Sequence, residues 1–544
     1  MRSYVHGVSS IPLLGETIAE NLRRTVQGKP NADALVVRSQ NKRYTWRELN
    51  EAVRRAGRGL MARGVQKGDR VGLWAPNRYE WVVLQYATAN IGAILVNLNP
   101  AYKTAELEYA LKQSGTSLLI YAKAFRTSDF HGMVQEVRPK CPDLREVLQL
   151  EEGWEQLLKD ADKISEDQLK ERESTLDPDD PINIQYTSGT TGFPKGATLS
   201  HNNILNNGFF IGETLGYSYG DRVCIPVPFY HCFGMVLGNL ACTTHGACMV
   251  IPGEAFDPLA VLEAVQAEKC TSLYGVPTMF IGILDHPRLQ EFDVSNLRTG
   301  IMAGSPCPVE VMKKVQNVLH MPEVTICYGM TETAPVSTQT ALDDPLEKRV
   351  GTVGRVHPHV EVKVVDPETG RTVPRGTPGE LCTRGYSVML GYWNNESGTR
   401  AAIDTSRWMH TGDLATMDEQ GYLNIVGRIK DMIIRGGENI YPREVEEYLY
   451  AHPAVSDAQV IGVPSEKYGE EVMAWVKLKP GAKADESSML AFCKNRIATF
   501  KIPRYWKFVE TYPMTVTGKI QKYKMREQAI QELGLHEAAK VKTA

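Results

Sequence analysis

Hydrophobic and polar positions along the first 200 residues follow helix and strand periods in turn. A capping box at Thr45 and Glu48 precedes an apolar stripe with helical spacing, and Gly64 is a stop signal. Further helical patterns start near Tyr79 and at Thr104. Short apolar runs predict strands at residues 70–74, 93–96, 118–121 and 182–186. Helices that alternate with buried strands predict parallel sheets covered by helices.

The pattern changes after residue 150. Residues 151–180 are charged and poor in apolar residues, which predicts a surface helix and loop. Strand-like runs at residues 360–365 and 379–383 are separated by turn residues and predict a more antiparallel unit. After Gly427 the expected elements are helix 443–451, strands 458–463 and 472–477, helix 488–500 and strand 505–509. The predicted fold is therefore α/β. It has a large N-terminal body of parallel helix-covered sheets, an antiparallel β subdomain and a small α+β C-terminal domain.

Composition excludes several classes of protein. The 544 residues include 61 Lys+Arg and 64 Asp+Glu, a net charge of −3, so no basic surplus indicates a nucleic-acid partner. Ten cysteines are sparse, and none of them forms a Cys-x-x-Cys pair, which argues against a disulfide scaffold or a zinc ribbon. The most apolar stretch, residues 81–96, is interrupted by Gln85 and Asn90 and is too short to span a membrane. We expect a cytoplasmic protein without an integral membrane segment. An organellar matrix and a homodimer remain open alternatives.

A glycine-rich segment carries the clearest chemical signal. Residues 186–197 read Tyr-Thr-Ser-Gly-Thr-Thr-Gly-Phe-Pro-Lys-Gly-Ala and follow the predicted strand 182–186. Glycines allow close backbone approach, and the hydroxyls and the lysine supply donors, so the segment suits a polyphosphate. It is not a Walker motif, because Phe-Pro separates Gly192 from Lys195. Its candidate phosphate-binding residues are Thr187, Ser188, Gly189, Thr190, Thr191, Gly192 and Lys195.

This segment resembles the phosphate loop of the adenylate-forming superfamily, which includes the acyl-CoA synthetases. Six further elements of that family follow in the same order along nearly the whole chain. They are Pro-Phe-Tyr-His-Cys-Phe-Gly at 228–234, Ala-Gly-Ser-Pro at 303–306, Tyr-Gly-Met-Thr-Glu at 328–332, Thr-Gly-Asp at 411–413, Gly-Arg-Ile-Lys-Asp at 427–431 and Gly-Lys at 518–519. Residues 427–442 and the segments at 99–102 and 181–185 further resemble medium-chain acyl-CoA synthetases of the mitochondrial animal type and their bacterial relatives.

The resemblance implies two half-reactions at one site. A carboxylic acid and ATP give acyl-AMP and pyrophosphate, and coenzyme A then takes the acyl group and releases AMP. Lys519 would bridge the two reacting anions, and Glu332 beside Thr331 would bind Mg²⁺. The turn Gly304-Ser305-Pro306 and Tyr328 would contact adenine, while Asp413 with Arg428 would hold the ribose.

The same resemblance implies the domain organisation and the acyl pocket. Residues 1–427 would form the body, 428–431 a hinge that contains Lys430, and 432–544 a mobile domain. Gly436 and Gly437 would approach the pantetheine arm of coenzyme A. The pocket candidates are mostly apolar or small, which suits an aliphatic or aryl acid; they are His231, Phe233, Ala303, Gly329 and Val336.

Each of these residues also has an ordinary structural interpretation. Lys519 lies near Lys522, Lys524 and Arg526, and alone it would be a solvated lysine. A lone histidine such as His231 in an apolar stretch is more often a core residue than a catalyst. Two other classes also stay open: a kinase or ATPase that releases ADP, and a nucleotide sensor that binds ATP without releasing pyrophosphate.

Overall fold

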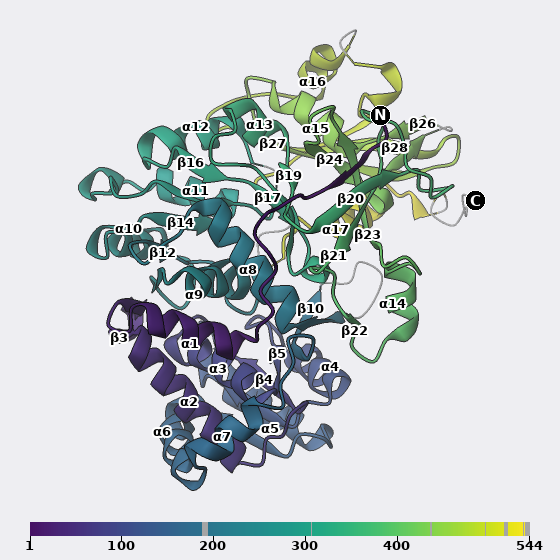
Figure 1. Ribbon diagram of the computed structural model, residues 1–544. Helices are drawn as coiled ribbons and strands as arrows, with labels where there is room; N and C mark the ends of the chain where they lie inside the picture. Colours follow the sequence, from purple (N-terminus) through teal and green to yellow (C-terminus); the bar gives the residue numbers. More distant parts are fainter. Residues whose placement is uncertain are drawn as a thin grey trace. The chain divides into compact units, whose positions relative to one another are not determined.

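The structure is a computed structural model that describes residues 1–187, 194–305, 307–435, 438–494, 497–515, 520–536 and 538 (Figure 1). It divides into two compact units. The larger unit comprises Val5–Val362 and Thr383–His410, and the smaller unit comprises Met1–Tyr4, Lys363–Cys382 and Thr411–Ala544. The division into residues 1–427, a hinge at 428–431 and residues 432–544 stays a prediction.

The first sheet of the larger unit has seven strands and is parallel at its centre. Strands β10, β5, β4, β6 and β9 run parallel, and β11 and β22 extend the β10 edge in antiparallel register. In sheet order the strands are β22 (Gly391–Tyr392), β11 (Lys195–Ser200), β10 (Pro181–Thr187), β5 (Ile94–Asn97), β4 (Arg70–Trp74), β6 (Leu118–Tyr121) and β9 (Glu146–Gln149). The four predicted strands are confirmed within one or two residues.

A second seven-stranded sheet of the larger unit is parallel except for its β2–β3 hairpin. Its order is β16 (Glu323–Thr325), β15 (Thr299–Met302), β14 (Ser272–Gly275), β12 (Arg222–Cys224), β13 (Cys248–Ile251), β2 (Asp33–Val37) and β3 (Lys42–Thr45). A small antiparallel sheet adds β17 (Cys327–Gly329), β18 (Val336–Gln339) and β19 (Arg355–Val356), and a hairpin pairs β7 (Ala124–Phe125) with β8 (Ser128–Asp129).

Helices cover these sheets. Thr45 and Glu48 form the expected capping box of α2, and the apolar stripe at Leu49, Val53 and Leu60 is fully buried. Figure 1 shows α1, α2 and α3 packed side by side. The helices of this unit are α1 (Ile18–Gly28), α2 (Trp46–Ala62), α3 (Tyr79–Ile91), α4 (Thr104–Ser114), α5 (Phe130–Val137), α6 (Leu150–Asp160), α7 (Glu166–Glu173), α8 (His201–Leu215), α9 (Ala241–His245), α10 (Pro258–Ala267), α11 (Pro277–Leu284), α12 (Val309–Val318), α13 (Leu346–Gly351) and α14 (Glu396–Ala402).

The smaller unit is built around a sheet in the order β26 (Glu438–Ile440), β25 (Ile433–Arg435), β28 (Gly469–Leu478) and β27 (Val455–Ser465), with β29 (Tyr505–Phe508) parallel to β28. Its helices are α15 (Pro442–Tyr450), α16 (Glu486–Cys493) and α17 (Lys522–Glu532). Most residues of another five-stranded sheet belong to the same unit, in the order β1 (Tyr4–His6), β20 (Val360–Val365), β21 (Gly379–Gly385), β23 (Met409–Met417) and β24 (Leu423–Arg428).

The fold is the predicted mixed α/β arrangement, with two local corrections. Residues 151–180, predicted as one surface helix and a loop, contain most of α6 and all of α7, and each helix buries apolar side chains such as Trp154 and Leu169. The helix expected at residues 488–500 ends at Cys493, because Lys494 has an extended backbone that cannot continue the helical hydrogen bonds. A separate short turn follows at Thr499–Lys501. Across the part of the chain that the structure describes, no helix is both long and apolar enough to cross a membrane.

Candidate active site

The hairpin formed by β10 and β11 brackets the glycine-rich segment. Thr187 and Lys195 are the last paired residues before the connecting loop, and the Thr187 hydroxyl donates to the Lys195 carbonyl at 3.4 Å. The predicted donors between them, Ser188, Gly189, Thr190, Thr191 and Gly192, lie outside the described residues. The ends of the predicted phosphate loop are thus fixed by the antiparallel register of two buried strands.

Lys195 and Glu332 are connected by a residue that the sequence did not single out, Tyr392. The Lys195 Nζ lies 4.9 Å from the centre of the Tyr392 ring, and the Tyr392 hydroxyl donates to Glu332 Oε1 at 2.8 Å. Burial and the Glu332 carboxylate raise the pKa of Tyr392 above its usual value, so the hydroxyl remains a donor at physiological pH. Two predicted site residues, 137 positions apart, therefore meet across one aromatic ring.

The turn that carries Thr331 and Glu332 is tightly constrained. A side chain at Gly329 would place its Cβ 1.7 Å from the Pro335 carbonyl oxygen, so only glycine fits this position. Thr331 and Glu332 are buried, with 9% and 5% of their surface exposed. The Glu332 carbonyl accepts a hydrogen bond from the Met389 N–H at 2.9 Å. A rigid carboxylate beside a hydroxyl offers the hard oxygen donors that Mg²⁺ prefers, so these residues fit the predicted metal.

The segment at His231 adjoins the same turn. His231 Nδ1 accepts a hydrogen bond from the Phe233 N–H at 3.1 Å, which fixes the orientation of the imidazole. The thiol of Cys232 lies 3.9 Å from the Thr331 hydroxyl. Phe233 begins a buried π-helix, Phe233–Leu240, and its ring centre is 5.8 Å from that of Tyr274. The structure therefore brings the predicted acyl-pocket segment next to the predicted metal turn. The π-helix in this segment is consistent with a functional site, because π-helical turns are frequent at such sites.

Three of the remaining candidates of the larger unit, Ala303, Gly304 and Ser305, lie beyond the carboxyl end of the parallel strand β15, where open α/β sheets bind their ligands. Ala303 follows β15 and donates its N–H to the Gly275 carbonyl at 3.2 Å. Gly304 has a positive φ of 92° and Ser305 is exposed; Pro306 lies outside the described residues. Tyr328 is on β17, and the N–H of the buried Val336 donates to Asn207 Oδ1 at 3.0 Å.

The smaller unit pairs two further candidates. Asp413 on β23 lies opposite Arg428 on β24, and the Arg428 Nε donates to Asp413 Oδ1 at 3.1 Å. Gly412, with a positive φ of 70°, donates its N–H to Glu380 Oε1 at 3.1 Å. Lys430 follows in the short turn Ile429–Asp431. Gly436, Gly437 and Lys519 lie outside the described residues.

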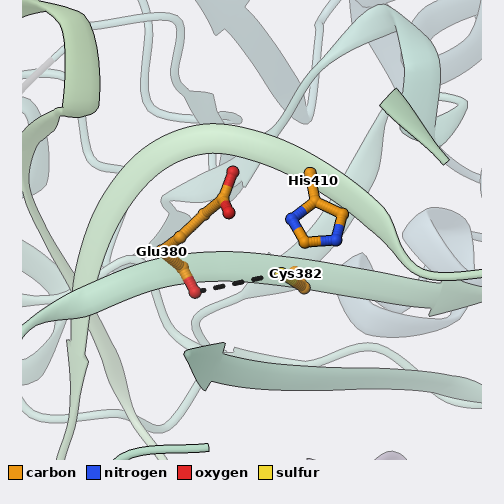
Figure 2. A group of neighbouring side chains, drawn as sticks. All are labelled: Glu380, Cys382 and His410. Atoms are coloured by element: carbon orange, nitrogen blue, oxygen red, sulfur yellow. Dashed lines mark hydrogen bonds between the residues drawn. The ribbon is translucent and has the colours of Figure 1, made fainter. Parts of the chain in front are cut away.

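A mixed group of side chains, Glu380, Cys382 and His410, comes from the adjacent strands β21 and β23 (Figure 2). Their potential ligand atoms lie within 4.8 Å of one another. Glu380 accepts the Gly412 N–H described above, and His410 Nε2 lies 3.8 Å from Asp404 Oδ2. We interpret the group as part of the hydrogen bonding that shapes the turn before Asp413.

Comparison with known proteins gives a consistent result. The family model of the AMP-binding enzymes matches residues 22–393, and that of the AMP-binding enzyme C-terminal domain matches residues 444–519. A putative acyl-CoA synthetase of Bacillus subtilis, YngI, is 50% identical over 96% of this chain and 99% of its own length. The mitochondrial medium-chain acyl-CoA ligase ACSF2 of Danio rerio is 46% identical over 98% of this chain and 91% of its own.

Solved structures agree with these relatives. ATP-bound MatB from Rhodopseudomonas palustris has a TM-score of 0.81 and 31% identity, over 94% of this chain and 99% of its own. The anthranilate CoA ligase AuaEII in complex with anthranoyl-AMP has a TM-score of 0.83 and 28% identity, over 96% of this chain and 99% of its own.

Proposed function

Because the chain belongs to the AMP-binding enzyme family, we propose that it is an AMP-forming fatty acid–CoA ligase that acts on medium-chain acids. The carboxylate attacks the α-phosphorus of ATP, which forms acyl-AMP and releases pyrophosphate. The thiol of coenzyme A then attacks the acyl carbon, and AMP leaves. The observation that carries the proposal is the 46% identity, over 98% of this chain, to a relative named as a medium-chain acyl-CoA ligase.

The first step must bring two anions together, so cations and fixed dipoles supply most of the catalysis. Lys519 would bridge the carboxylate and the α-phosphate, and Lys195 with Thr187 would hold the β- and γ-phosphates. Thr331 and Glu332 would hold Mg²⁺. When bound, this ion would neutralise charge on the triphosphate. The fixed carboxylate of Glu332 and its tyrosine donor support this assignment.

The nucleoside part of ATP would contact a further set of candidate residues. In our proposal Tyr328 and the turn at Gly304, Ser305 and Pro306 contact adenine. The Asp413 carboxylate, oriented by Arg428, accepts hydrogen bonds from the ribose hydroxyls. Carboxylates are suitable acceptors for a vicinal diol.

The second step would use a different set of residues. Lys430 would lie in the hinge, and Gly436 with Gly437 would line the approach of the pantetheine arm. His231 would gate the acyl pocket at the point where the thiol reaches the acyl carbon. The Phe233 N–H holds the His231 imidazole in one orientation at the predicted acyl pocket, and a gating role would require this hydrogen bond to break.

The acid is the least constrained part of the proposal. Phe233, Ala303, Gly329 and Val336 offer an apolar or small lining, which suits an aliphatic chain. An aryl acid is the second candidate, because AuaEII, which is named for anthranilate, aligns over 96% of this chain. For location we propose the cytoplasm; the matrix of an organelle is the alternative, because the ACSF2 relatives are named as mitochondrial. A homodimer stays a prediction, and gel filtration tests it.

One assay separates these candidates. Pyrophosphate and AMP are measured with a panel of C2 to C16 fatty acids and several aryl acids, with and without coenzyme A. We expect acid-dependent pyrophosphate release, AMP release that depends on coenzyme A, and an optimum among the medium chains. An optimum with an aryl acid would make that acid the substrate in place of a medium-chain fatty acid. Release of ADP would indicate a kinase or ATPase, and ATP binding without pyrophosphate release would indicate a sensor.

A further inference from the structure

Tyr392 is held in place by its backbone on both sides. Strand β22 pairs with β11, so Tyr392 lies opposite Ala197, two residues after Lys195. The Tyr392 N–H donates to the Thr399 hydroxyl at 2.8 Å, and the next residue, Trp393, donates its N–H to the Gly196 carbonyl at 2.8 Å. The backbone of Tyr392 is therefore held beside the phosphate-loop strand by the sheet, independently of the contacts that its ring makes.

The ring and the hydroxyl of Tyr392 contact side chains of opposite charge. Its ring face carries the Lys195 ammonium, 4.9 Å from the ring centre, and its hydroxyl donates to Glu332 Oε1 at 2.8 Å. An aromatic face attracts a cation, and a phenol hydroxyl is a strong donor to a carboxylate. One side chain therefore contacts both a cation and an anion of the candidate site.

We propose that Tyr392 is a positioning residue that keeps Lys195 and Glu332 apart and orients each of them for its own ligand. The inference rests on the proposed function, in which Lys195 serves the phosphates and Glu332 the metal. A direct ion pair between Lys195 and Glu332 would neutralise both charges and remove them from ATP and Mg²⁺. The hydroxyl of Tyr392 also fixes the rotation of the buried Glu332 carboxylate, so this order is already present before the metal binds.

The test is the variant Tyr392→Phe, which keeps the ring under Lys195 and removes only the donor to Glu332. Mn²⁺ is titrated into the enzyme in the presence of α,β-methylene-ATP, and free Mn²⁺ is followed by electron paramagnetic resonance. We expect about tenfold weaker Mn²⁺ binding, the size of one lost hydrogen bond to a charged group. Pyrophosphate release should recover at high Mg²⁺, because excess metal compensates for weaker binding.

A second variant tests the other half of the inference. Tyr392→Leu removes the ring as well, so Lys195 loses its support. We expect the KM for ATP at saturating Mg²⁺ to rise about threefold in Tyr392→Leu and to stay unchanged in Tyr392→Phe. The matched control is Tyr44→Phe, because Tyr44 also lies under a lysine, Lys42 at 5.0 Å, but is on β3 of the other seven-stranded sheet.

A double-mutant cycle identifies the partner. In a Glu332→Gln background, Tyr392→Phe should change Mn²⁺ binding by less than twofold, because the carboxylate that it orients is gone. Unchanged Mn²⁺ binding in Tyr392→Phe, an activity loss that high Mg²⁺ does not rescue, or the same loss in the Glu332→Gln background would each overturn the inference. Thermal melting of each variant identifies a general loss of structure. If the wild type binds Mn²⁺ with ATP but releases no pyrophosphate with any acid, the proposed function fails instead.

Discussion

Two buried histidines of the larger unit, His201 and His357, make its stability sensitive to acid. His201 Nδ1 accepts the Ile18 N–H at 3.2 Å, and His357 Nε2 lies 2.8 Å from Gln339 Oε1. The other ring nitrogen of each is buried and has no hydrogen-bond partner among the described residues. Burial lowers the pKa of both imidazoles to about 4, so both are neutral in the folded protein at physiological pH.

Acid should therefore unfold this unit. An unfolded histidine binds a proton near pH 6.5, whereas these two bind one only near pH 4, so their stabilising effect is complete above pH 6.5 and is lost as the pH falls to 4. We expect the free energy of unfolding to fall by about 3 kcal/mol for each histidine over this interval. Urea unfolding at pH 7.5, 6.5, 5.5 and 4.5 measures it. His357→Gln should remove about half of the pH dependence, and the exposed His131→Gln should leave it unchanged; equal slopes in all three proteins would contradict the assignment.

At the scale of single residues, the sequence predicted charged candidates for the site but not the side chain that contacts two of them. Lys195 lies in a glycine-rich run of unusual composition, and Glu332 is indicated by the resemblance of residues 328–332 to an element of the family. Tyr392 carried no such signal: Gly-Tyr-Trp is an ordinary turn sequence, and its role depends on β22 pairing with β11 nearly 200 residues earlier in the chain. Long-range pairing of a two-residue strand leaves no periodic pattern, so no local rule could have selected Tyr392.

At the scale of an element, the π-helix Phe233–Leu240 is held by buried side-chain amides. Gln85 Nε2 donates to the Met235 carbonyl at 3.0 Å, and Gln85 Oε1 accepts from Asn239 Nδ2 at 2.8 Å. The Met235 sulfur lies 3.1 Å from the amides of Asn97 and Gln185 on β5 and β10. π-Helical turns are rare, and these buried amide contacts stabilise the one that begins at Phe233.

Gln85→Leu should loosen this element. The change leaves the Met235 carbonyl and the Asn239 amide without their partner, which costs about 2 kcal/mol of stability. Because Phe233 begins the same helix, we also expect the KM for the acid to rise and the KM for ATP to stay close to wild type. Urea unfolding and steady-state kinetics measure the two effects. The control is Gln27→Leu on the exposed side of α1, and a variant as stable as that control would contradict this account.

The elements that sequence predicted well share one property, an apolar pattern with a clear period or a clear end. The strands at 70–74 and 360–365 match β4 and β20, and the α2 capping box is present as expected. The run Phe233–Leu240 is buried on all sides, and a uniformly apolar stretch does not distinguish an α-helix from a π-helix. The sequence did not predict the end of α16 at Cys493, because the helical spacing of apolar residues continues beyond Lys494, where the backbone is already extended.

At the scale of the whole molecule, the protein has a net charge of −3, yet the proposed substrate ATP carries four negative charges. Positive side chains must therefore be concentrated at the site that binds it. The sequence predicts that Lys195, Arg428 and Lys519 supply the local positive charge. Lys195 belongs to the larger unit and Arg428 to the smaller one, and Lys519 lies outside the described residues. Their convergence on ATP stays a prediction. It can be tested through function, because the first half-reaction should depend on Lys519 and the second on the predicted hinge at Lys430.

Separate measurements of the two half-reactions test that dependence. Lys519→Ala should lower acyl-AMP formation at least about a hundredfold, because it removes the cation that bridges the reacting anions, and should leave thioester formation from added acyl-AMP nearly intact. Lys430→Pro should do the reverse, because proline fixes φ in the Ile429–Asp431 turn and restricts the residue before it, which stiffens the predicted hinge. Lys524→Ala, an exposed lysine on α17, is the matched control and should change neither step. Equal loss of both steps in Lys519→Ala would mean that one arrangement of the site serves the whole reaction, and the hinge would then have no part in catalysis.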